Sequence, residues 1–585
     1  MPKWNHSAQT LLNHLRQNPS HLLQSHAFLL RHNLFIDPIL YTKLLALFSL
    51  SNLDYARRIF DFGPHKHDSF LCNIILKEYK EKGRFFDGFR FYKELRRKGF
   101  ILGDGFTMLS LAKCCGGIGC VRGSGQVHLG VIRDGFGSDL YVGTAVVDMY
   151  VKVGAMGVAR KVFDGMGERS QVSWTVLVCG YARSGDLGSA RECFDWMPEK
   201  DLPAFNAIVD GYAKAGESGM ARSLFDGMPE KNVVSWTSLI NGYCNGGEVE
   251  MARELFDAMP EKNLFTWNAM IGGYCQNKRP QEALKLFHEL QSCRLFEPDD
   301  VTVAGVLAAI ADLGALELGV WVHQYAQMRR LDKEINVHTA VIHMYAKCGE
   351  ITKAMCVFEA METTEIAPWN VMINGFALNG CCEEALQLFR EFMSRGLKPN
   401  EITMIGVLSA CNHGGLVEEG RKWLKEMGTF GLIPRIEHYG CMIDLFGRAG
   451  CLEEAEKLLE SMPYEANEII LSSLLSACGY YRDPTRAERI LQKAAKMYPS
   501  NDGNYVLLRN VYAVERRWMD VEAIKSVMRK NGAKKQTGSS VIEVDNMVFE
   551  FVSGDKMHPF WDAIQSVLKW LQLQMKEKRR DLLDS

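Results

Sequence analysis

Apolar residues recur at helical spacing in short segments, and glycine-rich or polar stretches separate these segments. In residues 233–263, two predicted helices each place four apolar side chains on one face: Trp236, Leu239, Ile240 and Tyr243, then Met251, Ala252, Leu255 and Phe256. Gly246 and Gly247 interrupt the pattern between the two helices. Ser235 is a candidate N-cap for the first helix, and Pro260 cannot continue the second. The segment is therefore predicted to be a helical hairpin.

The same landmarks return at a step of 31 residues. Four Gly-Tyr pairs keep this step, beginning at Gly180, Gly211, Gly242 and Gly273. Five phenylalanines keep it as well: Phe163, Phe194, Phe225, Phe256 and Phe287. The tetrapeptide Met-Pro-Glu-Lys begins at Met197, Met228 and Met259. Because a hairpin of this length cannot bury a core alone, successive hairpins must stack, and the predicted fold is an all-α solenoid.

The repeat extends in both directions with some variation in length. Thirteen repeats cover residues 38–467: 38–68, 69–104, 105–139, 140–170, 171–201, 202–232, 233–263, 264–299, 300–334, 335–365, 366–400, 401–435 and 436–467. One type has 31 residues, and a second, of about 35, ends in a turn such as Gly396 to Pro399. A third type carries His128 or His323 in its second helix, on a face that favours packing over catalysis.

One position early in the first helix breaks the apolar pattern, and we term it the reading position. In nine of the repeats this position is a threonine or an asparagine: Thr42, Asn73, Thr144, Thr175, Asn206, Thr237, Asn268, Thr339 and Asn370. The last residue of these repeats is also short and polar: Asp68, Ser170, Asp201, Asn232, Asn263, Asp299 and Asn400. Three residues before the reading position, an apolar residue often occurs, as at Val172, Pro203, Val234 and Phe265.

An apolar row beside two polar rows suits flat heterocycles, since their faces stack on apolar side chains and their edges form hydrogen bonds. The alternative interpretation is that these polar residues cap helix N-termini. Capping explains their polarity. It explains neither the restriction to two residue types at the reading position nor the pairing with a short polar last residue.

The charge balance limits the kind of nucleic-acid binding that is possible. Lys and Arg total 68 and Asp and Glu total 70 in 585 residues, so the net charge of −2 excludes binding dominated by a bulk positive field. The 17 cysteines include no Cys-x-x-Cys, so we expect buried free thiols rather than a thiolate zinc site. No apolar run approaches the ~20 residues of a membrane span.

Residues 1–37 differ in composition from the rest of the chain. Asp37 is the first acidic residue, and Lys3, Arg16 and Arg31 are the only Lys or Arg before it. Three leucines share a helical face there: Leu11, Leu12 and Leu15. An acid-poor amphipathic start is typical of an organelle transit peptide, and a plain first helix of the fold is the alternative. This short, leucine-rich start favours the mitochondrion, with the chloroplast as the alternative.

The sequence resembles the pentatricopeptide repeat family of plants, in the subclass that alternates P, L and S repeats. The resemblance covers nearly the whole chain from about residue 26, and Val233 to Trp236 and Ala252 to Phe256 are near the family's consensus. It implies a right-handed superhelical α-solenoid of helix-turn-helix repeats. It also implies binding of single-stranded RNA, one base per repeat, read by the reading position together with the last residue of the same repeat.

Carried onto this chain, the family's code implies bases for several repeats. Thr42/Asp68 and Thr175/Asp201 imply G, Thr237/Asn263 implies A, Asn268/Asp299 implies U, Asn206/Asn232 and Asn370/Asn400 imply a pyrimidine, and Thr144/Ser170 implies a purine. Asn73 implies U if its partner is Asp104 rather than Gly103. Thr339 with Glu365 departs from the code, and the L repeats imply no base at Leu109, Ala304 and Ile405. The implied target is, 5′ to 3′, G-U-x-R-G-Y-A-U-x-x-Y-x-x, where R is a purine, Y a pyrimidine and x any base.

The carboxy-terminal end departs from the repeat. Residues 468–537 have the pattern of two helical pairs and resemble the family's E domain. Residues 538–585 resemble its E+ extension, with a predicted β-hairpin about Asp545-Asn546 and then a helix. The segment Ser539-Ser540-Val541 stands where Cys-Ser-Trp is usual in the family.

Many relatives carry a zinc deaminase beyond this point, which needs His-x-Glu and Cys-x-x-Cys, and this sequence contains neither motif. We therefore expect no deaminase, metal site or cofactor in this chain. The resemblance implies a factor that specifies a cytidine for C-to-U editing in an organelle transcript. A DYW-type cytidine deaminase and other editing factors would then act in trans. The alternatives are RNA stabilisation, splicing or translation without editing, and a protein-binding helical scaffold.

Overall fold

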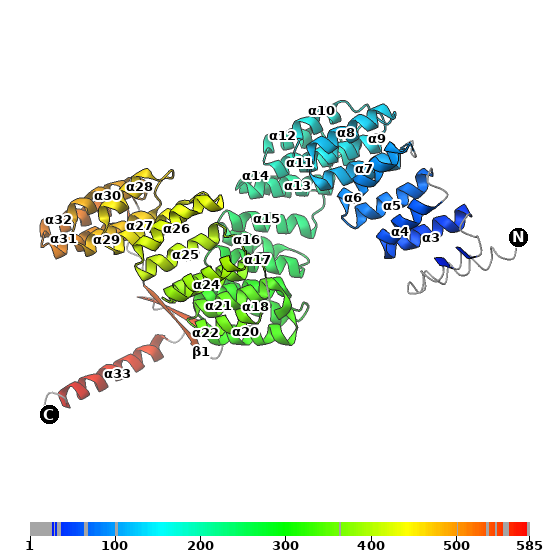
Figure 1. The fold of residues 1–585 in the computed structure, drawn as a ribbon. Coiled ribbons are helices and arrows are strands. Elements are labelled where there is room, and N and C mark those ends of the chain that lie inside the picture. Colours follow the sequence, from blue (N-terminus) through cyan, green and yellow to red (C-terminus); the bar gives the residue numbers. More distant parts are fainter. Residues whose placement is uncertain are drawn as a thin grey trace. The chain divides into compact units, whose positions relative to one another are not determined.

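The computed structural model describes residues 26–27, 30–31, 37–63, 68–99, 103–361, 364–499, 501–533, 538–544, 547–553 and 561–581. Nearly all of them belong to paired helices, which are followed by a two-stranded sheet and a last helix (Figure 1). The predicted all-α solenoid with a small carboxy-terminal β-hairpin is confirmed. The predicted targeting segment, residues 1–37, lies almost entirely outside the described residues.

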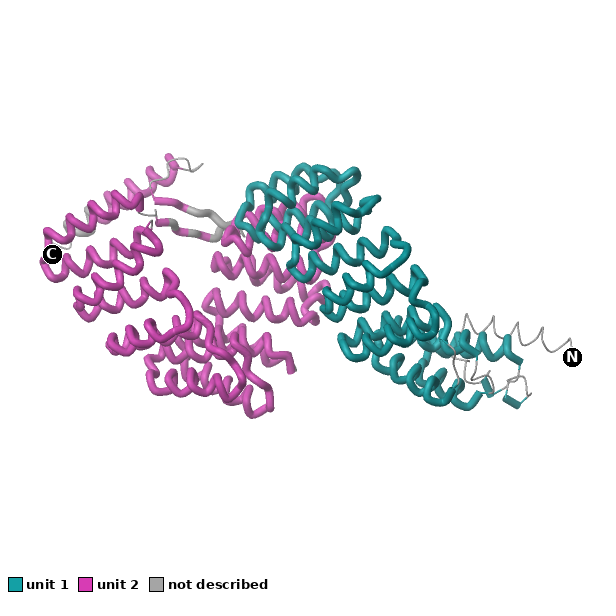
Figure 2. The backbone as a smooth tube through the Cα atoms, turned by 90° about the horizontal axis from the view of Figure 1, so that it is seen from above, with its two compact units in different colours: residues 1–262 teal, residues 263–585 magenta. Residues whose placement is uncertain are grey.

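The chain divides into two compact units, unit 1 with residues 1–262 and unit 2 with residues 263–585 (Figure 2). In unit 1 each repeat forms a first and a second helix: α3 (Pro38–Ser51) and α4 (Leu53–Phe62), α5 (Ser69–Glu81) and α6 (Phe85–Arg97), α7 (Gly105–Ile118) and α8 (Val121–Arg133), α9 (Leu140–Lys152) and α10 (Met156–Asp164), α11 (Gln171–Ser184) and α12 (Leu187–Trp196), α13 (Leu202–Lys214) and α14 (Ser218–Asp226), α15 (Val233–Asn245) and α16 (Val249–Ala258). First helices of successive repeats pack side by side, as α7 does on α9 and α13 on α15.

Unit 2 continues the same arrangement. Its repeats form α17 (Leu264–Gln276) and α18 (Pro280–Cys293), α19 (Asp300–Leu313) and α20 (Leu316–Met328), α21 (Ile335–Lys347) and α22 (Ile351–Glu359), α23 (Ile366–Leu378) and α24 (Cys382–Ser394), α25 (Glu401–Gly414) and α26 (Val417–Glu426), α27 (Ile436–Arg448) and α28 (Leu452–Ser461), with the short 3₁₀ helices η3 (Leu331–Lys333) and η4 (Met427–Phe430). Two more pairs follow: α29 (Glu468–Tyr480) and α30 (Pro484–Met497), α31 (Asp502–Val514) and α32 (Trp518–Lys530).

The last described elements are a β-hairpin and a helix. Strands β1 (Ser539–Val544) and β2 (Met547–Val552) pair in antiparallel register, Ser539 with Val552 and Val544 with Met547. Helix α33 (Trp561–Asp581) follows. The departure from the family's usual residues at the start of β1 therefore does not prevent strand pairing.

The start of α15 corrects one prediction. Asn232, and not Ser235, is the N-cap, because its side-chain oxygen accepts the Ser235 backbone N–H at 2.9 Å. Ser235 completes a capping box, since its hydroxyl oxygen accepts the Asn232 backbone N–H at 2.9 Å. The helix ends before Gly247, whose φ of +80° suits a glycine at the turn to α16.

The recurrent landmarks hold neighbouring hairpins together. Phe225 on α14 packs edge-to-face against Trp236 of the next first helix, with ring centroids 4.8 Å apart. Phe163 and Trp174 repeat the contact two steps earlier, at 4.7 Å. A side chain at Gly242 would place its Cβ 2.3 Å from Ala213 Cβ, so the glycine of this Gly-Tyr pair permits close approach of two first helices. The period in the sequence is thus a period of inter-repeat contacts.

His128 and His323 pack against the tyrosine of the next first helix. His128 Nδ1 lies 3.2 Å from the Tyr150 hydroxyl, and His323 Nδ1 lies 3.0 Å from the Tyr345 hydroxyl. Burial lowers the pKa of both histidines, which favours the neutral imidazole at neutral pH. Both therefore have the packing role that their helix face predicts.

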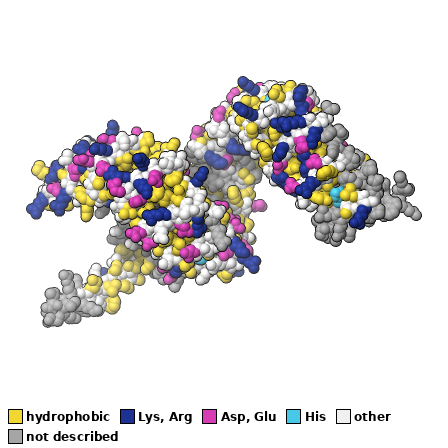
Figure 3. Space-filling view, in the orientation of Figure 1, with side chains coloured by type: hydrophobic (Ala, Val, Ile, Leu, Met, Phe, Trp, Pro, Cys, Tyr) yellow, Lys and Arg dark blue, Asp and Glu magenta, His cyan; other side chains and the backbone are white. Residues whose placement is uncertain are grey.

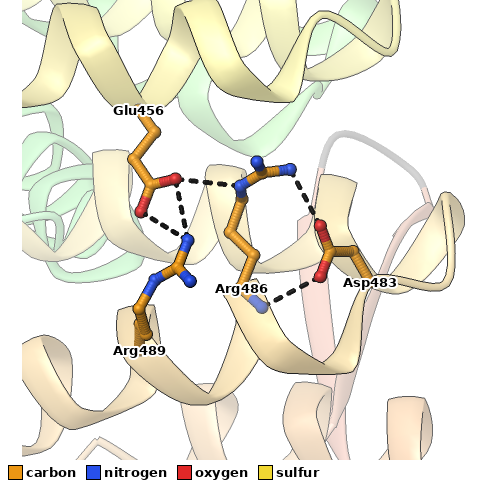
Figure 4. A network of polar contacts seen from close by, with 4 residues as sticks. All are labelled: Glu456, Asp483, Arg486 and Arg489. Atoms are coloured by element: carbon orange, nitrogen blue, oxygen red, sulfur yellow. Dashed lines mark hydrogen bonds and ion pairs between the residues drawn. The ribbon is translucent and has the colours of Figure 1, made fainter.

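Four charged side chains connect the last repeat to the helical pair beyond it (Figure 4). Arg486 on α30 donates to Glu456 of α28 at 2.9 Å and to Asp483 at 2.8 Å. Arg489 donates to both oxygens of Glu456, at 3.1 and 3.0 Å. The side chains of Arg486 and Glu456 are only 15% and 19% exposed. Burial alone would raise the pKa of Glu456, but the two guanidinium groups hold it below its usual value.

Candidate nucleic-acid interface

The last residue of each repeat is the N-cap of the next first helix. Its side-chain oxygen accepts a backbone N–H of the following turn at all ten positions with a short polar residue: Asp68, Asp104, Asp139, Ser170, Asp201, Asn232, Asn263, Asp299, Asn400 and Asn467. Capping, the alternative interpretation of these residues, therefore accounts for the short polar identity of this position. We term it the cap position. Glu365 makes no such capping bond, in keeping with its departure from the pattern.

Five reading-position side chains contact the cap residue of the next helix. The distances from the donor atom to the cap oxygen are 3.0 Å for Asn73 to Asp104, 2.7 Å for Thr175 to Asp201, 3.4 Å for Asn206 to Asn232, 2.9 Å for Asn268 to Asp299, and 3.1 Å for Asn370 to Asn400. The structure places Asp104, and not Gly103, against Asn73. These contacts bring together residues that lie about 30 positions apart in the sequence, from 26 to 31.

The other threonines at the reading position donate their hydroxyl to the carbonyl one turn back in their own helix. The acceptors are Pro38 for Thr42, Leu140 for Thr144, Val233 for Thr237 and Ile335 for Thr339, at 2.6 to 2.7 Å. Asn263, the last residue of the repeat that contains Thr237, belongs to unit 2, whereas Thr237 belongs to unit 1. Thr237 and Asn370 are nearly fully buried, and the other reading positions are half-buried.

An exposed apolar side chain stands two residues after the cap position in most first helices. Val172 is 60% exposed and Phe265 is 65% exposed, and Pro203 and Val234 are also exposed. The row is longer than the four residues that the sequence analysis named, since the same position is exposed at Ile39, Phe70, Phe106, Tyr141, Val301, Ile402 and Ile469. Their constant position, two residues after the cap, could have identified them from the sequence. A periodic row of exposed apolar groups indicates a binding surface.

Sequence reasoning missed three threonines that stand behind this surface. Thr107, Thr302 and Thr403 are fully buried at the third position of helices α7, α19 and α25. Their hydroxyls lie 2.7, 2.6 and 2.7 Å from the amide oxygens of Asn73, Asn268 and Asn370. Each threonine thus contacts the reading residue of the preceding repeat.

Two carboxylates at the cap position stay ionised because of these neighbours. Burial alone would raise the pKa of Asp299, but the Thr302 backbone N–H, the Thr302 hydroxyl and the Asn268 amide hold it below its usual value. The pKa of Asp104 is lowered against burial by Thr107 and Asn73 in the same way. Both caps therefore present hydrogen-bond acceptors at neutral pH.

Basic side chains lie three turns farther along the face of the exposed apolar row. Eleven residues separate Val172 from Arg183 and Pro203 from Lys214, an offset that returns to almost the same direction around a helix. The exposed basic residues at this position are Lys152, Arg183, Lys214, Lys347 and Arg448. Figure 3 shows Lys and Arg interspersed with Asp and Glu on the face in view, so positive charge is local rather than a continuous field.

The candidate interface changes character at the last repeat. The reading position there is Gly440, which has no side chain to offer a base. A groove of about 990 Å³ lies between α27 and α29, lined by Gly440, Asn467, Ile469 and Ser472 among others. Asn467 continues the row of caps and Ile469 the exposed apolar row in the next helix, whereas no hydrogen-bonding side chain stands at the reading position. The last repeat therefore offers contact without a defined base preference.

In the part of the chain that the structure describes, no three His, Cys, Asp or Glu side chains gather closely enough to hold a metal ion. None of the described helices is both long and apolar enough to span a membrane. All 17 cysteines are free thiols, but Cys120, Cys293 and Cys356 are exposed and not buried as predicted. Burial raises the pKa of Cys114 to about 11, which favours the unreactive protonated form.

Models of known families match much of the chain. The PPR repeat model matches residues 172–202, 203–233, 234–264, 337–364, 402–432 and 437–465, the PPR repeat family model 262–312 and 365–413, and the E motif model 481–543. A pentatricopeptide repeat-containing protein of Arabidopsis thaliana is 57% identical over 553 residues, which cover 94% of this chain and 100% of that protein. The chain belongs to the pentatricopeptide repeat family.

Other relatives and a solved structure agree with the family. A chloroplastic pentatricopeptide repeat-containing protein of Arabidopsis thaliana, named as putative, is 36% identical and covers 98% of this chain and 94% of its own length. A mitochondrial pentatricopeptide repeat-containing protein of Arabidopsis thaliana is 34% identical, and the match covers 95% of this chain and 72% of that protein. The crystal structure of maize PPR10 superposes with a TM-score of 0.50 at 17% identity over 85% of each chain, which shows the shared fold.

Proposed function

We propose that this pentatricopeptide repeat protein binds single-stranded RNA sequence-specifically, one base per repeat. The observation that carries the proposal is the contact between the reading and cap positions in five repeats, beside an exposed apolar row. Repeats of this family read one base each through two or three side chains.

The exposed apolar row, the paired reading and cap residues, and the basic residues each contact a different part of the RNA. Side chains such as Val172 and Phe265 offer apolar surface to base faces, and base stacking on such side chains tolerates any sequence. Thr175 with Asp201, and Asn268 with Asp299, offer donors and acceptors to the base edge. The basic residues at the ends of the first helices, such as Arg183, are placed to contact phosphates.

The proposed target is G-U-x-R-G-Y-A-U-x-x-Y-x-x, 5′ to 3′. The second base is U, because Asp104 is the residue that contacts Asn73. The base at the repeat of Thr339 stays open, because Glu365 lacks the capping geometry of the other last residues. A net charge of −2 leaves little nonspecific attraction, so discrimination between sequences is expected to exceed that of a basic RNA-binding protein.

Fluorescence anisotropy with a labelled 13-mer of this sequence tests the proposal, with adenine at the open positions. The matched control is the same composition in scrambled order. We expect at least a tenfold preference for the designed order, since each correct base contact contributes about 1–3 kcal/mol. Equal binding of the two RNAs would contradict the proposed specificity, and no binding of either would favour a protein-binding scaffold.

We further propose that binding selects a cytidine for C-to-U editing in an organelle transcript, 3′ of the bases aligned with the repeats. The match of residues 481–543 to the E motif supports this proposal. A DYW-type cytidine deaminase acting in trans, with other editing factors, would supply the chemistry. Relatives are labelled mitochondrial or chloroplastic, and the acid-poor start favours the mitochondrion.

Sequencing of organelle transcripts from plants that lack the protein tests the editing proposal. The expected result is loss of conversion at one or a few cytidines preceded by a match to the proposed target. Full editing at every site, together with altered transcript ends or splicing, would instead support stabilisation, splicing or translation.

A further inference from the structure

Asn73, Asn268 and Asn370 are held on both sides of their carboxamide groups. The nitrogen of each donates to the cap residue of the next helix, and the oxygen faces a buried threonine hydroxyl. Each hydroxyl also lies near its own cap oxygen, at 2.8, 2.7 and 3.0 Å, and in all three cases the asparagine oxygen is the closer acceptor.

These contacts fix which end of the carboxamide carries the donor. If Asn268 turned by half a rotation, its oxygen would meet the ionised Asp299, an acceptor against an acceptor. At Asn370 the cap is itself an asparagine, but its oxygen is held by the Thr403 backbone N–H at 3.0 Å. Asn400 therefore offers only an acceptor to Asn370, and the orientation is fixed there as well.

Asn206 provides a natural contrast. It pairs with Asn232, so its reading and cap residues are the same two types as at Asn370 and Asn400. The third residue of the next helix is Ser235 instead of threonine, and the Ser235 hydroxyl donates to the Asn232 backbone carbonyl at 2.8 Å. Within the described residues the buried Asn206 oxygen has no hydrogen-bond partner, and the Asn206–Asn232 distance is the longer one, 3.4 Å against 3.1 Å.

The methyl group of threonine explains the difference between the two residue types. Thr107, Thr266, Thr302 and Thr403 all hold the hydroxyl on the side of the cap's side chain, within hydrogen-bonding distance of its side-chain oxygen. Ser173 and Ser235 direct it toward the backbone carbonyl of the cap. A β-branched side chain has few χ1 rotamers, whereas serine turns freely toward the nearest acceptor.

We propose that Thr107, Thr302 and Thr403 are positioning residues that set the choice between uracil and cytosine at the preceding repeat. The proposal rests on the proposed RNA-binding function. All three threonines belong to L repeats, whose own reading residues Leu109 and Ala304, for example, offer no hydrogen bond to a base. The L repeat thus contributes to specificity through the repeat before it.

The chemistry of the two pyrimidines makes a fixed carboxamide selective. Uracil presents an acceptor at its 4-position and a donor at its ring nitrogen N3, and cytosine presents the reverse order. A carboxamide that can turn over matches either base. A carboxamide that is held in a single orientation, as at Asn370, matches one of the two bases. Against the other base it would place donor against donor or acceptor against acceptor.

The experiment compares RNAs that differ only in U or C at one position. One pair varies the base facing repeat 366–400, and a second pair varies the base facing repeat 202–232, with the rest of the proposed target constant. The affinity ratio between the two pyrimidines is measured by anisotropy at one salt concentration. The variants are Thr403→Val, Ser235→Thr and, as the matched control, Thr266→Val, a buried capping threonine that faces no carboxamide at the reading position.

We expect the wild type to discriminate more strongly at repeat 366–400 than at 202–232. Thr403→Val should reduce the ratio at 366–400 about fivefold, the value of one hydrogen bond, and leave 202–232 unchanged. Ser235→Thr should raise the ratio at 202–232. Thr266→Val should change neither ratio even if it lowers the melting temperature as much as Thr403→Val does.

Unchanged ratios in Thr403→Val and Ser235→Thr, with the designed target still preferred over the scrambled RNA, would overturn this inference alone. Equal discrimination at the two repeats in the wild type would overturn it as well. Failure of the wild type to prefer the designed target would overturn the proposed function and this inference with it.

Discussion

In the four short repeats of residues 140–263, arginine and aspartate pair within one second helix, whereas at the end of the last repeat glutamate and arginine pair between helices. The pairs within helices keep the step of 31 residues: Arg160–Asp164, Arg191–Asp195, Arg222–Asp226 and Arg253–Asp257. Their aspartate side chains are at least half exposed, from 50% to 55%. The pair of Glu456 with Arg486 joins α28 to α30 with side chains only 19% and 15% exposed, and Arg489, which is 54% exposed, also donates to Glu456.

The difference shows that two kinds of contact hold successive hairpins together. In the short repeats, phenylalanine, tryptophan and glycine landmarks make the inter-repeat contact, and the exposed ion pairs only support a single helix. Past residue 467 these landmarks no longer keep the step of 31 residues, and a largely buried ion pair connects α28 to α30. A buried pair stabilises its contact strongly once both partners are present, because loss of one leaves the other uncompensated.

The largest expected effect is that of Glu456→Gln. It should lower the free energy of unfolding by about 3 kcal/mol, because Arg486 and Arg489 lose the carboxylate that they share. Urea denaturation followed by circular dichroism measures it. The control is Glu453→Gln, on the exposed side of the same helix. Equal effects of the two variants would remove the distinction between buried and exposed charges.

A second prediction contrasts base reading in the repeats with its absence beyond them. Thr175→Asn should change the preferred base at its repeat from G to U, an effect of about 2 kcal/mol. Ser472 stands at the equivalent position of α29, but its hydroxyl donates to Asn504 at 2.7 Å. Ser472→Asn should leave base preference unchanged in the same anisotropy assay. A new base preference in that variant would extend base reading into the helical pairs beyond residue 467.

Acid should weaken the buried charges specifically. The folded-state pKa of Glu456 lies below 4.5, the ordinary value of glutamate, so its contribution is complete above that pH and is lost as the pH falls through the lowered pKa. The stability difference between the wild type and Glu456→Gln should therefore shrink as the pH decreases from 6 to 3. Urea midpoints across that range measure it, and a constant difference would contradict the assigned pKa direction.

The smallest expected effect is that of Asp226→Asn in a short repeat. Arg222 and Asp226 pair four residues apart on an exposed helix, and such pairs contribute about 0.3–0.5 kcal/mol. Moderate salt should abolish the difference from the wild type. A loss above about 1 kcal/mol in urea denaturation would show that these periodic pairs also help to join the repeats.

Local patterns predicted the hairpins well, because apolar spacing, glycine turns and proline ends act within one repeat. The cap of α15 was predicted at Ser235 and lies at Asn232, since two residues able to cap stand three apart and form one capping box. The contacts of Thr302 with Asn268 and of Arg486 with Glu456 join residues 34 and 30 apart. Such contacts become visible only once neighbouring helices are in register. The recurrence of threonine three residues after the cap in L repeats was the available signal.

The cap residue that each hairpin shares with the next has a consequence for protein engineering. A cassette cut at the repeat boundary would carry Asn268 and Asp299 but leave Thr302 behind with the following segment. Exchange of such cassettes would therefore combine the Asn268–Asp299 pair with the third helix residue of a different repeat. Junctions placed four or more residues into the next first helix would transfer the pair together with its own threonine.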